Sequence, residues 1–203
     1  MAEIKTLFVS KLYRARVQEA EALIADLKRA CLFIAEEDSA GQAWSREHAY
    51  QGFTSYASLN DLPRRDPAFA ALKKILDKHA ADFAAALHLD LGGRRLTLDS
   101  LWVNVLAPGG GHTGHIHPHS VLSGTFYVET PKSASSLKLE DPRLPMMMAA
   151  PPRREDAPEE ERGFVYETPQ AGDILMWESY LRHEVPPNGA RKPRISVSFN
   201  YSW

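Results

Sequence analysis

The hydrophobic pattern of the chain changes at Gly92 and Gly93, and this change limits the folds that the sequence can adopt. Before it, apolar residues recur at steps of three and four, which predicts amphipathic helices over residues 17–33 and 66–87. After it, short segments rich in β-branched and aromatic residues predict strands. Helices first and strands afterwards indicate an α+β domain whose helices pack on one outer face of a sheet.

The size of the chain suits one globular domain over residues 1–203. Its 203 residues are 44% hydrophobic, enough to bury a sizeable core. We expect residues 1–93 to be a mainly helical support and residues 94–203 to form the strand core. Residues 141–163 combine methionines, prolines and charges, so we expect a mobile surface loop or a lid over a substrate. The predicted strands are residues 96–98, 100–106, 124–129, 174–177 and 195–201.

Charge and composition argue against several classes of partner. The formal net charge of −2 offers no basic excess for a phosphate backbone, so we expect no nucleic acid. No apolar stretch approaches the length that spans a membrane, and we expect a cytoplasmic protein. Cys31, the single cysteine, lies in an apolar helical stretch and is expected to be a buried, inert thiol. The sequence does not define the oligomeric state, and a homodimer is compatible with it.

Three histidines predict a metal site. His115 and His117 are two residues apart, so on a strand both imidazoles point to one face. His183 follows a second predicted strand, and three neutral imidazoles on one metal leave coordination positions open for a reacting group. The same alternation makes His119 a reserve ligand, whereas His112 is expected in a loop.

The last predicted strand alternates strictly between polar and apolar residues. If its apolar face packs on the helical half, Arg194 points into the interior, where a buried guanidinium needs an anion. Its planar fork suits a carboxylate bound through two hydrogen bonds. The Asn188-Gly189 turn signal predicts that His183 and Arg194 lie on neighbouring antiparallel strands. The polar face comprises Arg194, Ser196, Ser198 and Asn200, and the apolar face Ile195, Val197, Phe199 and Tyr201.

These motifs together resemble a known family. The H-x-H pair, the distal histidine and Arg194-x-Ser196 are similar to the motifs of the iron(II)- and 2-oxoglutarate-dependent dioxygenases. More narrowly, five segments resemble a group of small, mostly bacterial oxygenases of that superfamily. The segments are residues 102–105, 115–118, 123–128, 141–143 and 194–200.

The resemblance implies a double-stranded β-helix, or jelly-roll, core over residues 94–203. It implies iron(II) on the three histidines, with no catalytic residue beyond these ligands, and 2-oxoglutarate as co-substrate. Arg194 and Ser196 would hold the distal carboxylate of 2-oxoglutarate, and Asn104 and Tyr127 would line its pocket. The implied reaction uses dioxygen to hydroxylate an unidentified small-molecule or peptide substrate.

One ligand departs from the superfamily pattern and keeps other functions open. His117 stands where the superfamily usually has Asp or Glu, which raises the net charge of the metal site by one. A cupin-like protein would need a glutamate near Val121 and Leu122. A three-histidine zinc protein with an activated water leaves Arg194-x-Ser196 unexplained. A non-catalytic metal-binding protein of the same fold is the remaining alternative. His48 shows no partner for a site.

Overall fold

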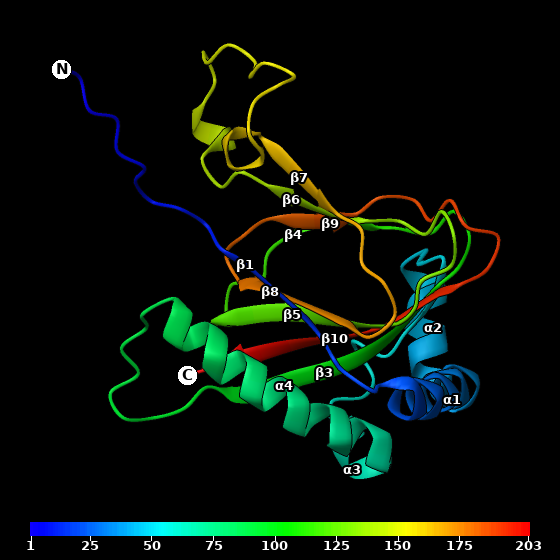
Figure 1. Cartoon of the computed structure of the whole chain (residues 1–203). Helices are drawn as coiled ribbons and strands as arrows, with labels where there is room; N and C mark the ends of the chain where they lie inside the picture. The colour runs from blue at the N-terminus through cyan, green and yellow to red at the C-terminus, as the bar shows by residue number, and fades with distance from the viewer.

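Two antiparallel sheets face each other, and helices cover the outer face of the larger one (Figure 1). The computed structural model describes residues 1–203. The helices are α1 (Glu21–Glu37), α2 (Ser39–Glu47), α3 (Leu62–Arg65) and α4 (Pro67–Ala86). The strands are β1 (Leu12–Arg16), β2 (Gly52–Thr54), β3 (Thr97–Leu106), β4 (His112–His115), β5 (Leu122–Glu129), β6 (Leu137–Glu140), β7 (Phe164–Glu167), β8 (Asp173–Glu178), β9 (His183–Val185) and β10 (Arg194–Ser202). The larger sheet has the order β1-β8-β5-β10-β3-β2 and the smaller one β4-β9-β6-β7.

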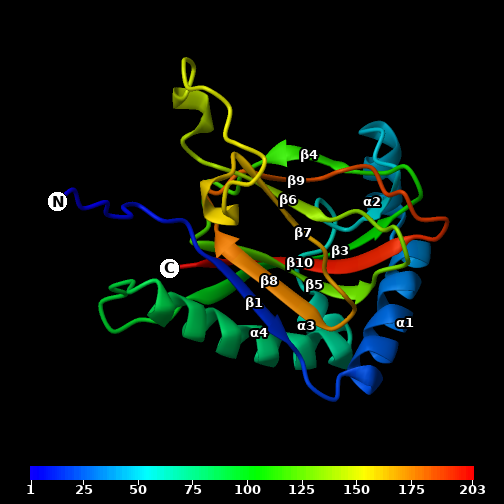
Figure 2. The same ribbon diagram turned by 45° about the horizontal axis from the view of Figure 1, so that its top comes forward.

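The two long helices pack beneath the six-stranded sheet, as the sequence predicts (Figure 2). The side chain of Asp66 caps α4 by accepting a hydrogen bond from the Ala68 N–H at 2.7 Å, and Pro67 starts the first turn. Cys31 lies fully buried on the sheet-facing side of α1. These helices and the sheet form a core of 24 buried residues, which is the main apolar body of the protein.

Strand β10 lies between the helices and the interior of the jelly roll. Its apolar residues Ile195, Val197, Phe199 and Tyr201 belong to the core shared with the helices. Its alternate residues therefore face the other sheet, where Arg194, Ser196 and Ser198 line a cavity. The predicted division of this strand into an outer apolar face and an inner polar face is confirmed.

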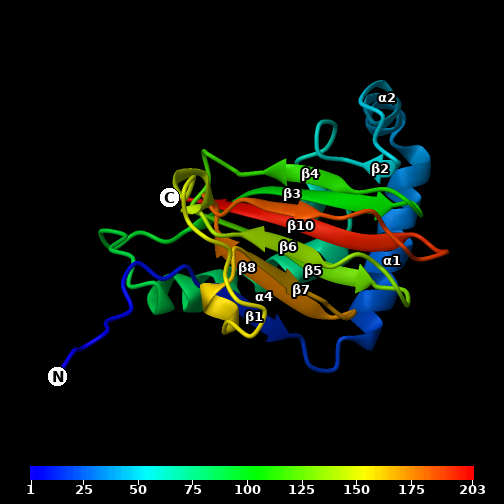
Figure 3. The same cartoon turned by 90° about the horizontal axis from the view of Figure 1, so that it is seen from above.

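The four-stranded sheet lies over the six-stranded one, and the space between them is only partly filled by apolar side chains (Figure 3). A second cluster of six buried residues fills one part: Tyr127, Leu137, Leu139, Leu175, Trp177 and Leu181. The rest is a cavity lined by both polar and aromatic side chains. The architecture is the double-stranded β-helix that the resemblance implies, with helices on one outer face.

The N-terminal half contributes two strands in addition to its helices. β1 pairs with β8 at one edge of the larger sheet, and β2 pairs with β3 at the other. Both strands are too short for a hydrophobic period to stand out in the sequence. The segment of residues 141–163 projects away from the sheets beyond β6 and β7 (Figure 1), and none of its residues lines the cavity. No helix of the structure is long and apolar enough to cross a membrane.

Candidate metal centre

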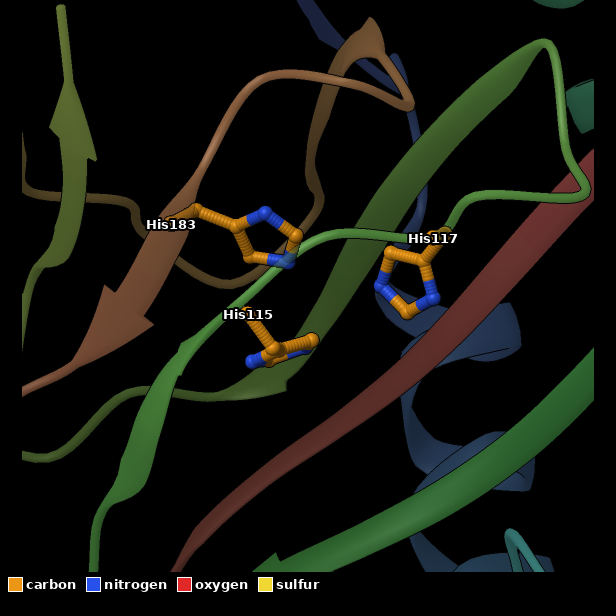
Figure 4. A group of neighbouring side chains, drawn as sticks. All are labelled: His115, His117 and His183. Carbon is orange, nitrogen blue, oxygen red and sulfur yellow. The ribbon is translucent and has the colours of Figure 1, made fainter. Parts of the chain in front are cut away.

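Three imidazoles converge in the interior between the sheets (Figure 4). His115 ends β4 and pairs across the smaller sheet with His183, the first residue of β9. His117 approaches from the segment that follows β4. The ring centroid of His115 is 4.4 Å from that of His183 and 5.0 Å from that of His117. One ring nitrogen of each histidine lies within 4.8 Å of those of the other two, so all three are within reach of one metal ion.

Hydrogen bonds and burial keep these imidazoles neutral, with a free ring nitrogen. Nδ1 of His115 is 2.7 Å from the carbonyl oxygen of Thr113, and Nδ1 of His183 is 2.9 Å from that of Leu181. A carbonyl only accepts, so each Nδ1 carries the proton and each Nε2 keeps its lone pair. Burial first, and then the neighbouring His115, lower the pKa of His183 to about 3 and that of His117 to about 4. Both are therefore neutral near pH 7, the form that binds a metal.

His117 lies outside the strand, which corrects the expectation of an H-x-H pair on one strand face. β4 ends at His115, and the backbone N–H of His117 donates to the carbonyl oxygen of Ser179 at 3.0 Å. Pro118 has no amide hydrogen with which to continue the ladder. The Nδ1 of His117 lies 3.5 Å from the side-chain amide nitrogen of Asn200, and its other ring nitrogen points toward the other two histidines (Figure 4).

Arg194 faces the histidines from the opposite sheet and not from a neighbouring strand. β9 belongs to the four-stranded sheet and β10 to the six-stranded sheet. The prediction that His183 and Arg194 lie on adjacent strands is therefore wrong. Pro186 and Pro187 have no amide hydrogens for a hairpin ladder, and the side chain of Asn188 donates to carbonyl oxygens at the end of β3. The connection consequently crosses between the sheets.

A cavity of about 540 Å³ lies beside the three histidines. Arg194, 2% exposed, is among its lining residues, and no Asp or Glu is. Its Nε, the hydroxyl of Tyr127 and the Nε1 of Trp177 are buried without a hydrogen-bond partner. Burial raises the pKa of Tyr127, and the charge of Arg194 offsets part of that rise, so the phenol stays protonated. The cavity thus presents three buried donors that lack an acceptor, an arrangement complementary to an anion such as a carboxylate.

The floor of the cavity is a hydrogen-bond network. Asn104 accepts from the hydroxyl of Thr54 at 2.9 Å and its amide nitrogen donates to the hydroxyl of Ser198 at 3.1 Å. Thr125 and Ser198 share a further hydrogen bond of 3.1 Å. Ser196 lies on the same floor, 2% exposed. Asn104 therefore anchors the network that joins β2, β3, β5 and β10 below the cavity.

Two histidines outside the cluster also line the cavity, contrary to the sequence prediction. His112 begins β4 and does not lie in a loop, and its Nε2 is 2.7 Å from the hydroxyl of Tyr50. Burial, followed by the nearby charge of Arg194, lowers the pKa of His112 to about 3. His48, which showed no partner in the sequence, stacks on Trp44. The reserve ligand His119 is exposed and outside the cluster.

The sequence also missed the aromatic lining of the cavity. Trp44 comes from α2, Tyr50 and Tyr56 flank β2, and Trp102 comes from β3. The aromatic residues between positions 44 and 56 were the available signal, because they do not follow the apolar face of either predicted helix. Trp102 shares the face of Asn104 by strand alternation, which could have placed it in the interior.

Fold and site together define a jelly-roll protein with a three-histidine cluster and, beside it, a cavity with buried donors that lack an acceptor. The family model described as "Putative 2OG-Fe(II) oxygenase" matches residues 100–200, the segment that carries the three histidines and Arg194. The chain belongs to this family, the 2OG-Fe(II) oxygenases. No curated protein matches the sequence.

Solved structures share the fold across nearly the whole chain. The alpha-ketoglutarate-dependent carbocyclase SnoK of nogalamycin biosynthesis aligns with a TM-score of 0.67 and 14% identity, over 95% of this chain and 79% of its own. A prolyl-4-hydroxylase of Pseudomonas putida aligns with a TM-score of 0.60 and 15% identity, over 95% and 92%. EctD of S. alaskensis, solved with 2-oxoglutarate and 5-hydroxyectoine, aligns with a TM-score of 0.64 and 14% identity, over 95% of this chain and 72% of its own. At these identities the likeness concerns the fold alone.

Proposed function

We propose that His115, His117 and His183 hold iron(II), and that Arg194 and Ser196 bind the distal carboxylate of 2-oxoglutarate. The observation that carries the proposal is the set of buried donors without an acceptor beside neutral histidines. A buried guanidinium without an anion is unfavourable by several kcal/mol, on the order of the penalty for an unpaired buried ion. A carboxylate has only acceptors, so it would satisfy these donors at once.

The lining residues suggest how 2-oxoglutarate is oriented. The guanidinium of Arg194 lies 4.9 Å from the ring centroid of Tyr127, so both can approach the same carboxylate. Trp177 contacts His183, with 4.6 Å between the ring centroids, and its buried Nε1 is a further donor without an acceptor. Asn104 keeps the floor in place through Thr54 and Ser198.

The bound pair would supply the oxidising chemistry: oxidative decarboxylation of 2-oxoglutarate to succinate and CO2, coupled to the insertion of one oxygen atom of dioxygen into a substrate C–H bond. The chain's own residues hold the protons in place. Backbone carbonyls keep a proton on Nδ1 of His115 and of His183, which leaves Nε2 for the metal. Asn200 can do the same for His117 once its amide makes half a turn, which presents the oxygen to a protonated Nδ1 while the hydroxyls of Ser100 and Ser123 exchange their donor and acceptor roles.

The alternatives explain less of the site. A three-histidine zinc protein and a cupin-like protein both account for the histidines, but neither needs the unpaired donors around Arg194. A non-catalytic protein of the same fold would keep both binding sites and lack turnover, and the presence of His117 makes this the main alternative. The substrate is proposed to be a small molecule or a peptide. A cytoplasmic location is part of the proposal, and a homodimer stays open.

The test is the conversion of 2-oxoglutarate to succinate by the protein supplied with iron(II) and dioxygen. We expect slow, iron-dependent succinate formation even without substrate, and its loss in His183→Ala. The matched control is His119→Ala, which removes an exposed histidine outside the cluster. Binding of iron and 2-oxoglutarate without succinate would favour the non-catalytic alternative, whereas succinate formation unaffected by His183→Ala would refute the assigned site.

A further inference from the structure

Four rings form a continuous wall of the cavity, from α2 to the three histidines. We call Trp44, His48, Tyr56 and Trp102 the aromatic wall, and all four line the cavity. The ring centroid of Tyr56 is 6.5 Å from that of Trp44 and 5.3 Å from that of Trp102. Trp102 is in turn 5.9 Å from the ring of His117. The aromatic wall therefore ends beside one of the proposed iron ligands.

The rings of the wall are arranged so that most of them are not stacked on each other. Tyr56 meets both tryptophans edge to face, at interplanar angles of 63° and 70°. Only His48 stacks on Trp44, at 13° and 4.1 Å between centroids. Tyr56 is 56% exposed, whereas Trp102 is buried, with 8% of its surface exposed. Unstacked ring faces beside a cavity are surfaces on which another flat ring packs well.

The charge of the cavity argues for a neutral occupant. Arg194 is the only lining residue with a permanent charge, and no Asp, Glu or Lys lines the cavity. In the proposed function, iron(II) and Arg194 carry three positive charges and 2-oxoglutarate carries two negative ones, so the loaded site keeps one excess positive charge, which disfavours a cation. A cationic substrate would then find no carboxylate and would face the metal, and an anionic one would find no second guanidinium. An uncharged ring needs neither partner.

We infer that the aromatic wall binds an uncharged flat ring of the substrate, with one edge of that ring directed toward His117. This inference rests on the proposed function, which places the reacting centre at the three histidines. The ring stacks against Tyr56 at the mouth, beside the stacked pair of Trp44 and His48, and Trp102 sets how closely it approaches the metal. The substrate class is therefore a neutral aromatic or conjugated cyclic compound, or a chain that carries one.

Calorimetric titration of the anaerobic protein, loaded with iron(II) and 2-oxoglutarate, tests this inference. The probes are indole, which is flat and neutral, cyclohexanol, which is neutral but not flat, and choline, which is a cation. We expect indole to bind at least tenfold more tightly than cyclohexanol, and choline to give no measurable binding. Tyr56→Leu and Trp44→Leu should each weaken indole binding at least fivefold. Trp203→Leu is the control, because Trp203 is 57% exposed and lies outside the cavity.

Loading is measured separately, as the rise in melting temperature caused by 2-oxoglutarate. If 2-oxoglutarate stabilises the protein but indole does not bind, the aromatic wall is not a ring site while the proposed function stands. Choline binding as tight as that of indole would also overturn the inference, in favour of a cationic substrate. Indole binding sensitive to Tyr56→Leu, without any effect of 2-oxoglutarate, would support the ring site and refute the proposed function. If neither 2-oxoglutarate nor indole binds, the proposed function and the ring site both fail.

Discussion

Replacing Arg194 by methionine separates the binding role of this residue from a structural role. The guanidinium is 2% exposed and no carboxylate lines its cavity, so without 2-oxoglutarate it is a buried charge without an anion. The ring of Tyr127 at 4.9 Å compensates only in part, since a cation–π contact contributes about 0.5–2 kcal/mol. The penalty of an unpaired buried ion is larger, several kcal/mol. Methionine fills similar space without that penalty.

We therefore expect Arg194→Met to leave the stability of the 2-oxoglutarate-free protein unchanged or to raise it, by about 1–2 kcal/mol at most, since replacing buried charges by apolar groups is neutral or stabilising. In the parent, 2-oxoglutarate at 100 times its dissociation constant should add about 2.7 kcal/mol. For a chain of this length that corresponds to a rise in melting temperature of roughly 5–11 °C. The variant should show no such rise.

The assay is anaerobic thermal unfolding with iron(II), with and without 2-oxoglutarate. Arg191→Met is the matched control, because Arg191 is exposed in the connection before β10 and outside the cavity. A variant that is clearly less stable than the parent, and yet is still stabilised by 2-oxoglutarate, would refute the reasoning. Arg194 would then be a structural residue whose partner is some other group.

Three further predictions follow from contacts around the site and the sheet edge. Asn200→Leu should weaken iron(II) binding about 10- to 100-fold, as loss of the partner of a metal-bound histidine does, and Asn200→Asp should restore most of it; equal losses in metal titrations would exclude a positioning role. His117→Asp lowers the net charge of the site by one, so we expect it to retain iron and to form succinate faster than the parent; a loss of iron binding would argue against this. Burial alone would raise the pKa of Asp173, but the Gln170 N–H, Arg16 and Arg14 outweigh it and hold the pKa below the ordinary value of 3.8. Because the folded pKa is lower than the unfolded one, this stabilisation is present above about pH 4 and is lost as the pH falls through the folded pKa. Asp173→Asn should therefore lower the free energy of unfolding by about 2 kcal/mol at pH 7 and weaken its dependence on pH in acid, as measured by denaturant unfolding at a series of pH values. An unchanged pH dependence in acid would contradict the assignment.

The features that the sequence predicts well are those set by a local period. The helical period before Gly92 and the strict alternation of β10 each follow from which side chains must face the core, so α1, α4 and the inward direction of Arg194 could be predicted. The histidine cluster could also be predicted, because more than one arrangement of the strands brings these three residues together, so the prediction did not depend on the correct sheet order.

The remaining features depend on contacts that no local pattern encodes. His117 reaches the cluster through a hydrogen bond to Ser179, after the strand has ended. The connection after β9 crosses to the other sheet because the side chain of Asn188 donates a hydrogen bond to Leu106 at the end of β3, which is far away in the chain. The aromatic wall is assembled from α2, from the segment that follows β2, and from β3 itself, so its rings become neighbours only in the folded protein.

The most direct test of the central claim is an anaerobic titration of iron(II), and then of 2-oxoglutarate, into metal-free protein. The account predicts a weak visible charge-transfer band that saturates at one equivalent of each, as expected when the keto acid chelates the iron. The band should be absent in His183→Ala and should need much more 2-oxoglutarate in Arg194→Met. No band in the parent protein, together with tight binding of zinc at the three histidines, would contradict the account and leave a zinc site as the better description.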